Sequence, residues 1–178
     1  HQIMTGLKLH LLALAVLFVL LSQTQLLHSS VEIGSISEVR GNAQVLRDKA
    51  YGAELKFDIQ QMDDVRTEAG RVAITFEDSS TVKLTEHSKL VIDEYIYDPD
   101  PSKSKMALKF ASGTARFITG KFNNKSNISI RTPTAQIAIR GTDFTCTVDE
   151  LGRSLVILLP DENGISSGEI LVSTAMGS

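Results

Sequence analysis

Outside the N-terminal segment, two side chains have the chemistry of a nucleophile and a base, namely Cys146 and His87. The other histidines are His1, His10 and His28. A cysteine beside a histidine can be activated as a thiolate nucleophile. Alternation along its segment, however, puts Cys146 on the same strand face as Phe144 and Val148. We therefore predict a small thiol buried in the core and no catalytic dyad.

Other arrangements expected of an enzyme or a metal site are missing from the sequence. No G-x-S-x-G elbow presents a serine nucleophile, and one cysteine with one domain histidine is too few for a typical zinc site. The chain has no Trp and only three Tyr to stack against sugar rings, which disfavours a carboxylate-pair glycosidase. Asp98 and Asp100 lack the oxygen spacing and the glycine of a calcium loop. We expect a protein that is not an enzyme, with no catalytic residue, metal or cofactor, and that acts by contact.

The charge of the chain limits its partners. The formal net charge is -3, from 18 basic and 21 acidic side chains, without a block of Lys or Arg. Nucleic-acid binding depends on basic patches that neutralise phosphates, so no nucleic-acid partner is expected. The same acidic balance argues against binding to an anionic membrane surface.

Residues 1–30 have the features of an export signal. Lys8 precedes the apolar run Leu11–Leu21, which has the length of a signal-peptide core and is short for a bilayer span. We predict a signal peptide or an uncleaved membrane anchor, which would be the chain's only contact with a membrane. The domain is then periplasmic or secreted, or held outside the inner membrane by the anchor. Because the chain starts at His1 and stops at Ser178 soon after a strand-like run, we expect that its C-terminus is truncated.

Residues 31–178 read as many short strands. Period-two alternation of apolar and polar residues recurs in five segments, with turn residues between them. The segments are 71–76, 81–85, 105–110, 136–140 and 144–148. This pattern predicts an all-β domain, either a sandwich or a short β-solenoid-like domain. The loop at 98–104 contains two prolines and divides the domain into possible halves, 31–97 and 105–178.

Four stretches together resemble the FecR domain family. Met62–Thr67 is similar to its "gDxvxT" step, and residues 73–84 are similar to its "atltfxDGSxvxL" hairpin. Residues 108–117 are similar to "lxlxxGxxrf", and residues 130–144 to "vxTPta…vRGTxF". The order and spacing agree from residue 31 to the chain end. The chain departs from the pattern at Ser79, which stands where the family has glycine and must therefore take the tight turn with a Cβ, at a cost if φ is positive there.

The last of these stretches supplies the candidate contact residues. They are Arg131, Thr132, Pro133, Thr134, Arg140, Gly141, Thr142 and Asp143. Thr132 and Pro133 suit a corner between two strands, because proline fixes φ and keeps the preceding residue extended. Gly141 suggests a bulge or a close backbone approach. Arg140 alternates outward from Ile139, where it either forms a structural salt bridge or contacts a partner.

The resemblance implies a sensor function. The best-known members are iron-uptake regulators whose periplasmic part senses an occupied outer-membrane receptor and whose cytoplasmic region binds a sigma factor. Since only ten residues precede the apolar run here, the chain resembles the secreted members, in which the domain follows a signal peptide directly. We expect a non-catalytic binding or sensor module that contacts a protein partner in the envelope, for example by strand addition. The alternative is a secreted structural or adhesion scaffold within a longer envelope protein.

Overall fold

The computed structural model of the protein describes Lys8, His10 and residues 31–121, 127–140, 143–160 and 169–174. The expected signal or anchor segment, apart from Lys8 and His10, lies outside the described residues. Residues 1–30 and 31–178 form separate units. Within the described part of the chain, there is no helix with the length and apolarity needed to cross a bilayer.

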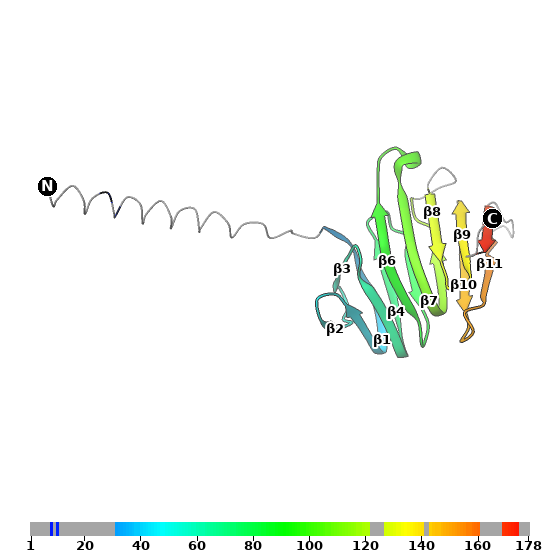
Figure 1. The fold of residues 1–178 in the computed structure, drawn as a ribbon, viewed down its shortest axis with the longest axis horizontal. Coiled ribbons are helices and arrows are strands. Elements are labelled where there is room, and N and C mark those ends of the chain that lie inside the picture. Colours follow the sequence, from blue (N-terminus) through cyan, green and yellow to red (C-terminus); the bar gives the residue numbers. More distant parts are fainter. Residues whose placement is uncertain are drawn as a thin grey trace. The chain divides into compact units, whose positions relative to one another are not determined.

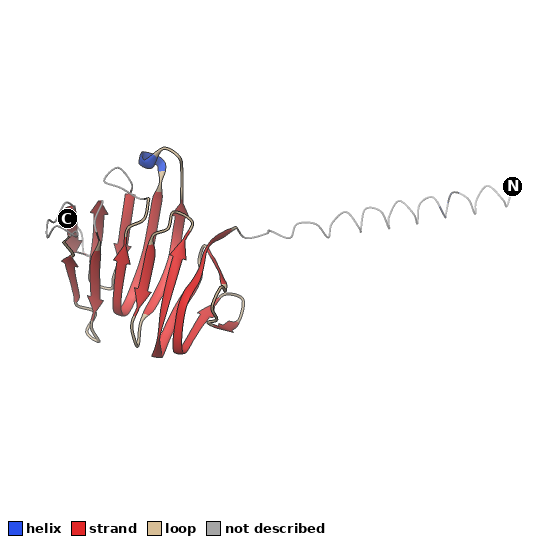
Figure 2. Ribbon diagram, turned by 180° about the vertical axis from the view of Figure 1, so that it is seen from behind, coloured by secondary structure: helices blue, strands red, loops and turns tan. Residues whose placement is uncertain are grey.

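The described domain is built of strands, and its one described helix is the 3-10 turn Pro101–Lys103, in the predicted long loop (Figure 2). The strands are β1(Glu32–Leu46), β2(Ala50–Gly52), β3(Asp58–Gln60), β4(Asp64–Phe76), β5(Thr81–Leu84), β6(Lys89–Ile96), β7(Lys105–Ile118), β8(Asn127–Arg131), β9(Ala135–Arg140), β10(Phe144–Val148), β11(Ser154–Leu158) and β12(Glu169–Thr174). The five alternating segments fall in β4, β5, β7, β9 and β10. The all-β prediction is therefore confirmed.

The strand pairings divide the domain into two layers that are joined by three long strands. The first layer has the order β3–β1–β4–β5–β7–β10–β11, and the second has the order β2–β1–β4–β6–β7–β8–β9–β12. Strands β1, β4 and β7 belong to both layers because each passes from one layer to the other along its length. All pairs are antiparallel except β7 with β8. Figure 1 shows the strands following one another from β2 and β3 at one end to β11 at the other.

Close backbone approaches mark the places where the long strands change layer. At Gly41 in β1, φ is +67°, and a Cβ would lie 2.3 Å from the carbonyl oxygen of Ala69 in β4. At Gly113 in β7, φ is +98°, and a Cβ would lie 2.6 Å from the Cα of Ser88. Only glycine adopts such a φ at low cost and leaves room for the neighbouring chain. The bends therefore depend on these two residues.

The core fills the space between the layers. Phe117 and Phe144 of the first layer stack with ring centroids 5.1 Å apart. Inward side chains of both layers surround a void of only about 10 Å³. The lining residues of the two layers are Val82, Ala115, Phe117, Phe144 and Cys146 with Leu90, Leu108, Phe110 and Ile130. The layers are therefore packed face to face as in a sandwich.

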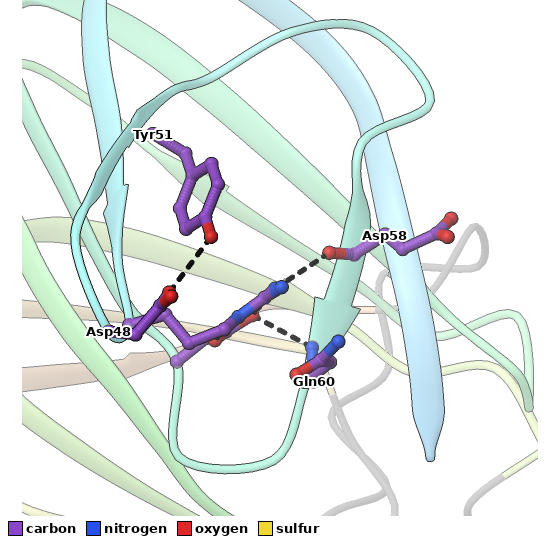
Figure 3. Close-up of polar contacts among 6 residues, drawn as sticks. Asp48, Tyr51, Asp58 and Gln60 are labelled. Atoms are coloured by element: carbon purple, nitrogen blue, oxygen red, sulfur yellow. Dashed lines mark hydrogen bonds and ion pairs between the residues drawn. The ribbon is translucent and has the colours of Figure 1, made fainter. Parts of the chain in front are cut away.

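An ion pair closes the end of the sandwich that carries β2 and β3. Arg47 donates to both carboxylate oxygens of the buried Asp63, each at 2.7 Å. The same guanidinium donates to the carbonyl oxygen of Asp58, and the Gln60 N–H donates to Asp63 (Figure 3). Arg47 also lies 5.6 Å from the ring centroid of Tyr51, whose hydroxyl donates to Asp48. These contacts cover the apolar interior at this end.

Candidate functional site

The Thr132–Pro133 corner joins β8 to β9, as the sequence predicts. The Thr132 side chain is buried, and its hydroxyl oxygen accepts hydrogen bonds from the N–H of Ala135 at 3.0 Å and of Thr134 at 3.4 Å. The Thr132 N–H donates to the carbonyl oxygen of Ala135 at 2.9 Å. The Thr132 hydroxyl thus provides an acceptor for two backbone N–H groups of the tight turn, which the Pro133 side chain cannot do.

The same corner links the two layers. The hydroxyls of Thr132 and Ser154 lie 2.6 Å apart, and Thr134 donates to the carbonyl oxygen of Gly152 at 2.7 Å. Gly152 has a φ of +79°, and a Cβ there would lie 3.1 Å from the Cβ of Pro133. The β8–β9 corner of the second layer therefore packs against the β10–β11 turn of the first layer. Thr132, Pro133 and Thr134 hold the layers together.

Asp143 also has a structural position. Its carboxylate accepts hydrogen bonds from the backbone N–H and the hydroxyl of Thr119, both at 2.9 Å, directly after β7 ends. Its carbonyl oxygen accepts the N–H of Leu159. Gly141, for which the sequence suggests a bulge or a close backbone approach, and Thr142 lie outside the described residues.

Arg131 and Arg140 are placed differently from the rest of the motif. Both are exposed on the outer face of the second layer. Arg131 is the last residue of β8 and pairs with Gln136 of β9. Arg140 is the last residue of β9 and follows Ile139, which pairs with Ile128. Arg140 is therefore level with the first residue of β8. Four residues of extended strand separate these two levels, which is about 13 Å. The prediction that Arg140 points away from the buried Ile139 is confirmed.

The lysines of this face are paired, but the arginines are not. Lys105 and Lys109 of β7 form ion pairs with Glu94 and Asp93, at 2.9 and 3.5 Å. In the part of the chain that the structure describes, neither arginine takes part in an ion pair. This holds for Arg140 even though Glu169 of β12 lies opposite it in the register. Of the two possibilities for Arg140, the described contacts favour a free guanidinium over a structural salt bridge.

Small side chains separate the two arginines. Ala107, Ser129 and Ala138 stand side by side on β7, β8 and β9, in the row between the levels of Arg131 and Arg140. A groove of about 110 Å³ lies on this face, with Ala107, Ser129 and Arg131 in its lining. We call this surface, from Arg131 across the small row to Arg140, the arginine face. It offers two guanidiniums, each with several N–H donors that match a carboxylate.

Sequence reasoning did not identify the structural roles of the other motif residues. Asp63 in the first motif pairs with Arg47, and the Thr67 hydroxyl accepts the N–H of Ser88 at 2.9 Å. In the second motif, the buried Asp78 accepts hydrogen bonds from Tyr95 at 2.7 Å and from Ser80 at 2.6 Å. One sequence signal was available: Asp63 and Asp78 each stand close to an end of a strand, where a buried carboxylate needs hydrogen-bond partners. Ser79 takes the tight turn with a positive φ of +70°.

Cys146 has the buried environment that the sequence predicts, and His87 lies at the surface. The Cys146 side chain is fully buried, and burial raises the pKa of its thiol to about 11. His87 lies in the exposed turn between β5 and β6, with a φ of +55°. A thiol with a raised pKa holds little thiolate near neutral pH and is a poor nucleophile. Among the described residues, no group of three His, Cys, Asp or Glu side chains is arranged to hold a metal ion.

Comparison with known proteins identifies one relationship. Residues 63–160, more than half of the chain, match the profile of the family described as FecR protein. No curated protein and no solved structure matches the chain significantly. The matched segment runs from the buried Asp63 to the end of the β10–β11 hairpin. It therefore includes the arginine face.

Proposed function

The chain belongs to the FecR family, an envelope-associated family of sensors and regulators linked to iron-uptake signalling, and from this we propose that it is a non-catalytic sensor module that binds a protein partner in the bacterial cell envelope. The partner binds at the arginine face. The observation that carries the proposal is that Arg131 and Arg140 are exposed without an ion pair in the described chain. The remaining described residues of their motif are used in turns and between layers.

The chemistry of the arginine face specifies an acidic partner. Each guanidinium can bind a carboxylate through two parallel hydrogen bonds. The row of small side chains lets an extended segment lie close to the sheet between the two arginines. Carboxylates four residues apart on an extended segment are separated by about 13 Å, which matches the separation of the two arginine levels. Binding should therefore weaken as salt concentration rises.

Site-specific cross-linking in the envelope tests this function. A photoreactive residue replaces Ala138, in the middle of the arginine face, and cells are grown with and without available iron. We expect an adduct with one envelope protein, and expect Arg131→Glu with Arg140→Glu to abolish it. The matched control is Arg116→Glu on the outer face of the first layer, an exposed mid-strand arginine in β7. An adduct that survives the double substitution, or is lost equally in the control, would refute the arginine face as the partner site.

The same experiment separates the sensor from the scaffold alternative. A sensor has a defined partner, and its adduct should change in amount or in partner between the two iron conditions. A secreted structural or adhesion scaffold gives adducts that do not depend on iron. Iron-independent adducts with structural envelope components would replace the sensor function with the scaffold function.

A further inference from the structure

The two ends of the sandwich differ. At the end formed by β2 and β3, the pair of Arg47 with Asp63 closes the interior, and the edge strands are three residues long. At the opposite end, β11 pairs with β10 and β12 pairs with β9, and neither has a second partner strand in the described chain. The outer side of β11 therefore presents backbone N–H and C=O groups that pair with no described strand. We call this the open end.

Apolar side chains that point inward are uncovered at the open end. Val172 of β12 is paired with Ile137, which is 1% exposed, and both face the interior of the sandwich. Val172 is nevertheless 56% exposed. An open cavity of about 450 Å³ lies here between the layers. Its lining is Ala135, Ile137, Ser154, Val156, Ile157, Leu158, Ile170 and Val172.

The edge strand β11 lacks the features that normally protect an edge. Its sequence, Ser-Leu-Val-Ile-Leu, contains no charge and no proline, and its pairing with β10 has no bulge. Leu155 and Ile157 are exposed on its outer face. Charged residues, prolines and bulges are what keep the edges of monomeric sheets from pairing with other strands. The absence of all three indicates an edge that is covered in the functional protein.

We propose that the open end binds the open end of a second copy of this chain, with antiparallel pairing of the two β11 strands. In an antiparallel pair centred on Val156, Leu155 of each copy lies opposite Ile157 of the other. No charged residue of β11 then lies opposite an apolar one, because β11 contains no charged residue. A partner edge must be uncharged, apolar and of similar length, and β11 itself has all three properties. The described edge strand β3, by contrast, is short and carries Asp58.

The symmetry of this contact ends the assembly at two copies. A contact between identical surfaces is related by a two-fold axis and closes on itself. The other end is covered by Arg47 and carries only short edge strands, so it does not offer a second apolar edge. A stable interface needs roughly 800 Å² per partner. The apolar part of this interface comes from Leu155 and Ile157 on the outer face and from the residues that line the cavity.

The molar mass of residues 31–178 in solution tests the proposal. All described strand pairings and the whole described core lie within this segment, so it is tested without residues 1–30. Sedimentation equilibrium over a range of concentrations should give a dimer. Ile157→Lys, at a position already 49% exposed, should weaken the dimer at least about tenfold without altering the thermal midpoint of the monomer. The matched control is Leu55→Lys, 58% exposed in a turn before β3, which should leave the dimer unchanged.

A cysteine placed on the two-fold axis tests the pairing itself. Val156→Cys in a Cys146→Ser background should form an intermolecular disulfide under mild oxidation, because the two residues face each other at the centre of the antiparallel pair. A chain that stays monomeric up to about 1 mM overturns the proposal. So does a dimer that Ile157→Lys leaves intact, or a chain that binds an unrelated strand and not its own copy. None of these results alters the arginine face, so the two proposals fail independently.

Discussion

The guanidinium of Arg47 donates two 2.7 Å hydrogen bonds to the carboxylate of Asp63, and these connect the end of β1 to the start of β4. The side chain of Asp63 is 1% exposed, whereas that of Arg47 is 26% exposed. The pair therefore joins a buried anion to a partly solvated cation. Because Asp63 stands in the first family motif, this ion pair gives that motif a structural role.

Removal of Arg47 should destabilise the domain severely. Arg47→Ala leaves the Asp63 carboxylate buried without its cation, and we expect a loss of about 3–5 kcal/mol in the free energy of unfolding. Urea denaturation followed by circular dichroism measures it. The matched control is Arg153→Ala, which breaks an exposed pair with Asp149 and should cost at most about 1 kcal/mol. Equal losses in both variants would contradict the structural role of the buried pair.

Gly113 should tolerate no side chain. Gly113→Ala would place a Cβ 2.6 Å from the Cα of Ser88, at a φ of +98°, where β7 changes layer. Strain and overpacking together should cost more than about 2 kcal/mol. At Gly52, by contrast, a Cβ meets nothing within 4 Å. Gly52→Ala therefore serves as the control and should shift the thermal midpoint little. A stable Gly113→Ala would mean that the layer change does not require this close approach.

The Thr132 hydroxyl should matter more than the Thr134 hydroxyl. Thr132→Val keeps the shape but leaves the N–H of Ala135 unsatisfied in a buried corner, which should cost about 1–3 kcal/mol. Thr134→Val loses a more exposed bond to Gly152 and should cost less. Denaturant midpoints of the two variants measure the difference. A larger loss of stability in Thr134→Val would contradict this, because it would mean that the hydrogen bond to Gly152 contributes more than the hydrogen bonds within the corner.

Cys146 should resist thiol reagents and should make stability depend on alkaline pH. The pKa of its thiol is raised by burial from 9.0 to about 11. The folded state therefore favours the protonated thiol, and this contribution is complete below about pH 9 and is lost as pH rises through 11. Relative to Cys146→Ser, the wild type should lose roughly 2–3 kcal/mol over that range. Cys146→Ser itself should cost about 1–3 kcal/mol at pH 7.

Reactivity gives an independent check on that environment. In the folded protein, a thiol reagent at pH 8 should label Cys146 no faster than the domain unfolds. In denaturing urea, the labelling of Cys146 should become rapid. Fast labelling of the native protein, or a pH profile of the wild type parallel to that of Cys146→Ser, would place the thiol outside the core.

Local sequence patterns were enough to predict the all-β class, the buried face of each alternating strand, the corner at Thr132 and Pro133, and the tight turn at Ser79. Each of these follows from local chemistry: side-chain alternation, the fixed φ of proline, or a turn of a few residues. The signal or anchor segment, the partner and the two possible halves remain predictions.

The division of the motif residues between structural roles and the arginine face depends on tertiary packing. Thr132 meets Ser154, Asp143 meets Thr119, and Arg131 stands beside β7 because β8 pairs with that strand in parallel. The alternation pattern assigns a residue to a face, but it does not say which strand lies next to it. That neighbour depends on where the long strands change layer, and hence on packing across the whole core. A guanidinium that looks the same in the sequence is therefore paired at Arg47, whereas at Arg140 it forms no ion pair with a described residue.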